Sequence, residues 1–293
     1  MPKQGHIIIR GIVQGVGFRP FVYARAVAHG ICGSVCNTGS EVQVYAWGDN
    51  FEDFLRDLRA GPPLSVIDSV EVHTLQGEPP DSFTILKSHD GTRTGLIPPD
   101  IATCKDCVKD IFTRGGRYES YFATSCVNCG PRYSIIRSLP YDRERTTMDM
   151  FPPCPGCFEE YSDPSSRRHH AQTIACHECG PELILYSGAG EATEGTSPVK
   201  KTAELLDKGK IVAIRGIGGF HIACTGEIAT VLKKRLNRTE QPLAIMAKKE
   251  WILDNTSISP EEEKILQSDI SPIVILDKRE PEAFDHISNL HTI

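Results

Sequence analysis

The sequence predicts an α+β protein of several domains, and three observations lead to this fold class. A glycine-rich turn at 14–17 follows a short apolar strand and leads into a helix. Four C-x-x-C pairs occupy the middle of the chain, from 104 to 179. After a polar, glycine-rich stretch at 187–198, helices and strands alternate as in an α/β fold. We therefore expect domains at 1–90, 104–182 and 199–293, with linkers at 91–103 and 183–198.

The composition narrows the class of protein. The chain has 293 residues, of which 40% are hydrophobic and 24% charged, as is ordinary for a globular protein. No apolar run approaches the roughly 18 residues of a membrane span. The apolar segment near the start is too short for a secretion signal, and Arg10 and Gly11 interrupt it. The net charge of −6 argues against nucleic acid as a partner. We expect a cytoplasmic protein that binds neither membrane nor nucleic acid.

The first ninety residues predict a ferredoxin-like order of elements. A helix from Pro20 to His29 follows the glycine-rich turn, and a second helix, capped by Asp49, ends before Gly61. Residues 37–40 have the composition of a hairpin turn. Strands are expected at 6–13, 33–35, 41–47, 66–73 and 83–86. The first four of these strands and the two helices give the order β-α-β-β-α-β.

The turn after the first strand is a candidate anion site. Gly15 and Gly17 allow the backbone N–H groups of the turn to converge near the start of a helix, where such groups bind anions. Arg19 would add a planar charged fork for phosphate oxygens. The alternative is a turn that merely connects a strand to a helix.

Two motifs in this segment resemble the acylphosphatase family, QGVGFR at 14–19 and GSVCNTG at 33–39. The resemblance implies that Arg19 anchors the phosphate of the substrate and that Asn37 orients the attacking water. Such a reaction depends on positioning and charge, and no metal is required for it. The alternative for Asn37 is tolerance of a left-handed turn conformation. The phosphate-binding residues implied are Gly15, Val16, Gly17, Phe18 and Arg19.

The four cysteine pairs form a tandem repeat. The gaps between them are 18, 24 and 18 residues, and Arg117, Asp110 and Gly130-Pro131 are matched fifty residues later by Arg167, Glu160 and Gly180-Pro181. Four thiolates suit tetrahedral zinc, so we expect two structural zinc ions, with thiol redox chemistry as the competing interpretation. The expected ligands are Cys104, Cys107, Cys126, Cys129, Cys154, Cys157, Cys176 and Cys179.

The pairing of the cysteines stays open at this point. Equal gaps inside each repeat favour one zinc per repeat, whereas an interleaved arrangement would join the first pair with the fourth and the second with the third. His169 and His170 lie between the last two pairs. Because four cysteines already complete each site, we expect these histidines to be loop residues or to support the ligands.

The last hundred residues predict an α/β domain. Helices are expected at 199–207 and 228–236, strands at 211–214, 220–224, 243–246 and 273–276, and a turn at Gly216–Gly219. That turn is equally consistent with a ligand site and with a tight turn that binds nothing.

The order of these segments resembles the HypF family, the carbamoyltransferases of [NiFe]-hydrogenase maturation. The cysteine repeat with YFATSCVNCGPRYSIIRSLPYDRERTTM and SSRRHHAQTIACHECGP carries the likeness, and GKIVAIRGIGGFHIAC and QPLAIMAKK resemble the start of a YrdC-like nucleotide domain. The resemblance implies carbamoyl phosphate as substrate, ATP as cosubstrate and a HypE-like partner. Arg215, Arg235 and Arg238 are the candidate nucleotide-binding residues.

The resemblance is incomplete near the end of the chain. Arg215, Leu236 and Gln241 stand where that family usually carries lysine, and the sequence stops at Ile293 inside the domain. The expected function is therefore that of a truncated HypF-type carbamoyltransferase whose first domain hydrolyses acyl or carbamoyl phosphate. The alternative is a zinc-stabilised interaction module that keeps only the anion-binding turn.

Overall fold

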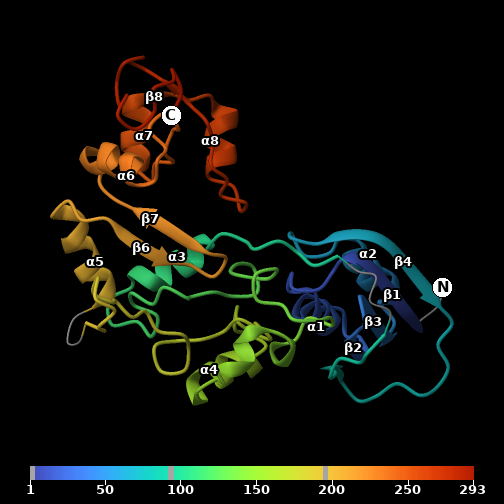
Figure 1. Cartoon of the computed structure of the whole chain (residues 1–293). Coiled ribbons are helices and arrows are strands. Elements are labelled where there is room, and N and C mark those ends of the chain that lie inside the picture. The colour runs from blue at the N-terminus through green and yellow to red at the C-terminus, as the bar shows by residue number, and fades with distance from the viewer. Residues whose placement is uncertain (1–3, 92–95, 194–196) are drawn as a thin grey trace. The chain divides into compact units, whose positions relative to one another are not determined.

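The chain consists of two compact units, Met1–Pro181 and Glu182–Ile293, in a computed structural model that describes residues 4–91, 96–193 and 197–293 (Figure 1). Parts of both expected linkers, at 92–95 and 194–196, lie outside the described residues, as do residues 1–3. Each unit is treated by itself below.

The N-terminal part of the first unit has the expected ferredoxin-like order, and the fifth expected strand lies at the edge of its sheet. Its sheet has the order β4-β1-β3-β2-β5, in which every neighbouring pair is antiparallel except β2 and β5. The elements are β1 (Gln4–Ile12), α1 (Phe18–His29), β2 (Cys32–Thr38), β3 (Glu41–Trp47), α2 (Phe51–Ala60), β4 (Val66–His73) and β5 (Phe83–Ile85).

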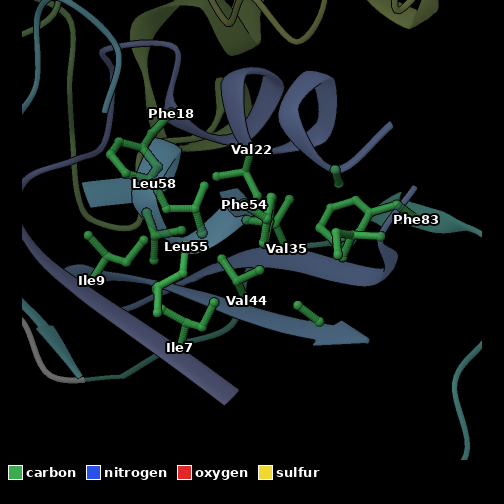
Figure 2. Packing of buried hydrophobic residues seen from close by; sticks show 14 of the residues in the cluster. Ile7, Ile9, Phe18, Val22, Val35, Val44, Phe54, Leu55, Leu58 and Phe83 are labelled. Carbon is green, nitrogen blue, oxygen red and sulfur yellow. The ribbon is translucent and has the colours of Figure 1, made fainter. Parts of the chain in front are cut away.

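An apolar core lies between this sheet and helices α1 and α2 (Figure 2). Alternate residues of β1, Ile7 and Ile9, are fully buried, as the two-residue period of a strand with one covered face requires. Phe54 and Leu58 project from α2 and Val22 from α1 into the same cluster. Burying each such side chain contributes roughly 1.5–3 kcal/mol, so this domain is held chiefly by apolar contact.

The structure differs from three local predictions. Helix α1 begins at Phe18, so Pro20 is its third residue, where a missing N–H still costs nothing because the first turn has no internal acceptors. Asn50, not Asp49, is the N-cap of α2. Asn37 lies within β2, paired with Val42, and the turn falls at 39–40. Tolerance of a left-handed turn therefore does not explain Asn37.

The cysteine repeat folds as two copies of one small module. Helix α3 (Lys105–Phe112) in the first copy matches α4 (Pro155–Ser162) in the second, and each is preceded by a cysteine. The agreement extends to the backbone, because Ser120 and His170 both have positive φ, at 58° and 55°. Both donate an N–H to the end of the preceding helix. The 3-10 turns η1 (Arg143–Arg145) and η2 (Thr147–Met150) lie between the copies.

The second unit contains short elements. Strands β6 and β7 form a hairpin whose turn is closed by a hydrogen bond of 2.7 Å from Gly216 N to Gly219 O. Helix α8 carries a capping box between Ser259 and Glu262. The elements are α5 (Pro198–Asp207), β6 (Val212–Arg215), β7 (Phe220–Ala223), η3 (Gly226–Ile228), α6 (Ala229–Arg235), α7 (Lys249–Asn255), β8 (Thr256–Ser257), α8 (Pro260–Leu266) and β9 (Asp277–Lys278).

Two strand predictions in this unit are wrong. Residues 243–246 and 273–276 are irregular, and β9 begins only at Asp277. A strand needs a neighbour to accept its backbone hydrogen bonds, and no described strand pairs with either segment. Met246 and Ile273 are accordingly exposed. Among the helices of the described ranges, none has the length and apolarity needed to cross a bilayer.

Candidate active site and metal centres

The glycine-rich turn is a tight loop pressed against the cysteine modules. Gly15 and Gly17 have φ of 70° and 73°, a conformation that favours glycine. A Cβ on Gly15 would lie 3.2 Å from the Arg132 side chain, and one on Gly17 would lie 3.3 Å from Val127. The N–H groups of Gly15, Val16 and Gly17 donate to no acceptor within the described ranges, which leaves them available to an anion.

Arg19 is buried beside this loop and is held by residues from distant parts of the chain. Its Nη1 donates to Ser88 Oγ at 3.0 Å, and its Nη2 donates to Asp142 Oδ1 at 2.7 Å and to Tyr141 O at 3.3 Å. The guanidinium has five N–H donors, so Nε and one hydrogen of Nη1 keep no partner in the part of the chain that the structure describes. Arg19 is thus fixed in place and still able to bind an oxyanion.

Asn37 faces the same space. The residue is 2% exposed, and its Oδ1 is buried with no hydrogen-bond partner among the described residues. Buried amide oxygens normally have a partner. Asn37, Arg19, Gly15 and Gly17 line one cavity of about 30 Å³. An amide oxygen, a guanidinium and free backbone donors around a small cavity can hold a phosphoryl group and orient a water molecule towards it.

The cysteine modules form the other wall of this cavity. Arg132 donates to the carbonyl of Gly15 and, at 2.9 Å, to the carbonyl of Val127. Gln14 accepts a hydrogen bond from Tyr141 N at 2.9 Å and donates to Gly39 O at 3.0 Å. These contacts fix the loop between the sheet and the modules, so the site belongs to both parts of the first unit.

His170 lies in a turn, as one of its two predicted roles implies, and it completes this wall. It lines the small cavity and also an adjoining cavity of about 410 Å³. Burial and the nearby Arg19 lower the pKa of His170 to about 4. The neighbouring His169 packs against Tyr23 of α1, with 5.5 Å between ring centroids. His169 thus contacts the N-terminal domain and His170 shares a cavity with it, which the cysteine spacing alone could not show.

The eight paired cysteines form two separate four-cysteine clusters, one in each module. Sequential pairing is found, because Cys104, Cys107, Cys126 and Cys129 converge in one group and Cys154, Cys157, Cys176 and Cys179 in the other. Sulfur–sulfur distances such as 3.7 Å for Cys104–Cys126 and 3.9 Å for Cys176–Cys179 match the spacing of about 3.8 Å that a tetrahedron of 2.3 Å zinc–sulfur bonds gives. Both clusters are compatible with structural zinc.

Each cluster receives hydrogen bonds from an arginine of the other module. Arg117 of the first module donates to Cys157 Sγ at 2.9 Å and Cys154 Sγ at 3.0 Å, whereas Arg167 of the second donates to Cys107 Sγ at 3.1 Å. Four thiolates around a divalent ion carry excess negative charge, which these guanidinium groups offset. Burial raises the pKa of Cys176, but the hydrogen bond from Arg117 is among the causes that lower it to about 6.

A buried ionic network joins the two modules at their centre. Arg168 is 4% exposed; it donates to Glu160 Oε2 at 3.0 Å and also contacts Asp110. Its guanidinium lies 3.9 Å from the centre of the Tyr118 ring, and Tyr118 donates to Glu160 at 2.9 Å. The acids that recur in the sequence repeat, Asp110 and Glu160, therefore bind one arginine between them.

The candidate nucleotide-binding residues lie in the second unit. Arg215 ends β6, Arg235 ends α6, and Arg238 follows that helix; all three are exposed. No ion pair involving them is found in the described part of this unit, and Arg215 lies over the Phe220 ring at 5.9 Å. Their role in binding a nucleotide remains a prediction.

Comparisons with known proteins agree with this architecture in order along the chain. The acylphosphatase family matches residues 5–85, the HypF finger family matches 103–136 and 154–186, and the family described as telomere recombination (Sua5, YciO and YrdC) matches 204–293. The carbamoyltransferase HypF of Rhodobacter capsulatus is 42% identical over 280 residues, which are 93% of this chain. The chain belongs to the HypF family. It covers 37% of the length of that relative.

Two further comparisons concern the structure and the first domain. A crystal structure of full-length HypF in a phosphate- and nucleotide-bound form matches 99% of this chain and 39% of its own, with a TM-score of 0.92 and 38% identity. An acylphosphatase of Caldivirga maquilingensis is 41% identical over 75 residues, which are 24% of this chain and 79% of the relative. The chain therefore contains an acylphosphatase domain, two four-cysteine modules and a YrdC-like domain.

Proposed function

We propose that this chain hydrolyses carbamoyl phosphate at Arg19 and Asn37 as the first step of a carbamoyl transfer. The observation that carries the proposal is the cavity in which Arg19, the unpartnered Oδ1 of Asn37 and the free N–H groups of the glycine turn meet. The related HypF proteins are named carbamoyltransferases, which supports the choice of acyl group.

The chemistry requires charge stabilisation and placement of water. The N–H groups of Gly15 to Phe18 and the Arg19 guanidinium would hold the phosphoryl oxygens, and Asn37 Oδ1 would accept a hydrogen bond from the attacking water. The water oxygen bonds to phosphorus as the bond from phosphorus to the acyl oxygen breaks. The acyl oxygen leaves with the electron pair as carbamate, and the protons of the water stay on the phosphate.

The other parts of the chain would serve the later steps. We assign hydrolysis to 1–90, metal binding to 104–182 and nucleotide binding to 199–293, with connecting segments at 91–103 and 183–198. In this proposal two zinc ions stabilise the modules, and ATP binds with the help of Arg215, Arg235 and Arg238. A HypE-like protein would receive the carbamoyl group. Eight thiols suited to a metal also support a reducing, cytoplasmic location.

Phosphate release from carbamoyl phosphate tests the proposal. Arg19→Ala should lower kcat/KM by about 100- to 1000-fold, on the scale of losing one preorganised charge, and Asn37→Ala should lower kcat with it. Arg25→Ala is the matched control, because Arg25 lies on the same helix and pairs with Asp57 at 3.8 Å, away from the cavity. Equal rates in all three variants would refute the proposal. Phosphate binding without turnover would instead favour a module that only binds anions.

A further inference from the structure

One polar group at the active site has no role in the proposed hydrolysis, the imidazole of His170. Three residues line both the small cavity and the adjoining larger one: Arg19, His170 and Gln172. His170 therefore stands at the junction between the space around the glycine turn and the space beyond Arg19. Its ring nitrogens have no hydrogen-bond partner in the described part of the chain, and its ring neighbours are Tyr161 at 5.0 Å and His169 at 4.7 Å.

The sister module shows that the fold does not require histidine at this position. Ser120 occupies the equivalent place, with φ of 58° against 55° for His170 and the same N–H bond to the preceding helix. Ser120 is exposed, whereas His170 faces the cavity. The backbone conformation at this position therefore does not depend on the imidazole, which lines the cavity.

The dimensions of the cavities indicate what His170 would meet. A space of about 30 Å³ has room for two or three water-sized groups, less than an acyl phosphate needs. With the phosphate at the glycine turn, the acyl end must pass the junction. Gln172 is already engaged there, since its amide donates to His170 O at 2.8 Å and its Oε1 accepts from Arg143 N at 2.8 Å. Both amide hydrogens of Gln172 are thus in use, since the second goes to Tyr161 Oη at 3.2 Å, whereas both ring nitrogens of His170 have no partner among the described residues and are free for the acyl group.

We propose that His170 contacts the acyl group of the substrate and selects a carbamoyl over an acetyl group by accepting a hydrogen bond from the carbamoyl N–H. This inference rests on the proposed hydrolysis. An acetyl group offers a methyl in place of that donor, and a site built to bond an N–H discriminates against an analogue that lacks it.

The surroundings keep this ring able to accept. The charged and titratable groups that act on it are Arg19, His169 and Asp142, and burial together with Arg19 lowers the pKa of His170 to about 4. At neutral pH the ring is uncharged, and an uncharged imidazole has one nitrogen that accepts and one that donates.

The test compares carbamoyl phosphate with acetyl phosphate as substrates of the full chain. His170→Ser gives the second module the residue that the first carries in the same backbone conformation, so the fold should be kept. We expect the ratio of kcat/KM for carbamoyl over acetyl phosphate to fall about tenfold, the effect of one hydrogen bond. His170→Asn, which tolerates positive φ, should lower the ratio as well. His169→Phe is the control, because it retains an aromatic ring against Tyr23, and its ratio should equal that of the wild type.

The outcomes separate this inference from the proposed function. An unchanged ratio in His170→Ser with normal metal content, or an equal fall for both substrates, would overturn the role of His170 and leave the hydrolysis standing. A wild-type chain that releases phosphate from neither substrate would overturn both.

Discussion

The N-terminal domain and the cysteine modules lie in one compact unit but are stabilised by different forces. The domain buries one apolar cluster that includes Ile7, Val22 and Phe54, between a sheet and two helices. The buried clusters of the modules consist in good part of cysteines, and Arg168 and Thr173 are buried among them. A short segment with few large apolar residues can thus fold around thiolates and guanidinium groups, provided that a metal joins the thiolates.

Metal removal should give the largest difference in stability between the N-terminal domain and the cysteine modules. Structural zinc contributes about 10–16 kcal/mol of binding free energy, and this energy is coupled to folding. A chelator that removes the metal should therefore unfold the modules, whereas the amides of β1 and β3 should stay protected against hydrogen exchange. Peptide-resolved exchange measures both.

The matched control for that experiment is a cysteine outside the clusters. Cys107→Ser should reproduce the loss of protection in the first module, and Cys36→Ser, at a buried cysteine of β2, should leave it intact. Protection of the modules that survives complete metal removal would contradict the comparison.

Arg168, the arginine between the two modules, provides the next test, because arginine–carboxylate pairs occur both in the modules and in the N-terminal domain. Arg168→Met should destabilise the first unit by about 1.5–3 kcal/mol, since it removes the buried guanidinium that Asp110 and Glu160 share. Each acid keeps one less buried partner, Arg167 for Asp110 and Arg117 for Glu160. Arg10→Met removes a partly exposed arginine that pairs with Glu41 and Glu71 on the sheet, and it should cost under about 1 kcal/mol. Urea unfolding of both variants gives the difference, and similar values would show that burial does not matter here.

Arg117 and Arg167 each donate to the cysteine cluster of the other module, an arrangement called crossed here. Replacing either arginine should have a smaller and more local effect. Arg117→Met should increase alkylation of Cys154 and Cys157 in the second module, because it removes charge-assisted hydrogen bonds of about 1.5–3 kcal/mol in total. Arg167→Met should expose Cys107 in the first module instead. Mass spectrometry of modified cysteines reads out each site, with the exposed Arg114→Met as the control. Loss of protection in the module that carries the substitution would contradict the crossed arrangement.

Local patterns in the sequence predicted most of the fold. Alternation in β1, the glycines at 15 and 17 and the C-x-x-C spacing within each cysteine pair act over a few residues, and these elements and the two four-cysteine clusters are found as expected. The strand predictions at 243–246 and 273–276 are wrong because apolar runs do not specify a pairing partner.

The sequence predicted only part of the candidate active site, for a related reason. Arg19 and the glycine turn form a contiguous motif, but Ser88 and Asp142 reach Arg19 from 69 and 123 residues away. No periodicity links such positions. The repeat did hold one usable signal, since Ser120 and His170 differ at a position where the two copies otherwise share their backbone.

The shared wall around Arg19 has a consequence for attempts to dissect the chain. An excised first domain would keep its sheet and its apolar core but would lose Asp142, Tyr141 and the side chains packed on Gly15 and Gly17. Catalysis by that isolated piece would report on a more open enzyme, with a freer arginine and less choice among acyl groups, than the one that the intact chain presents.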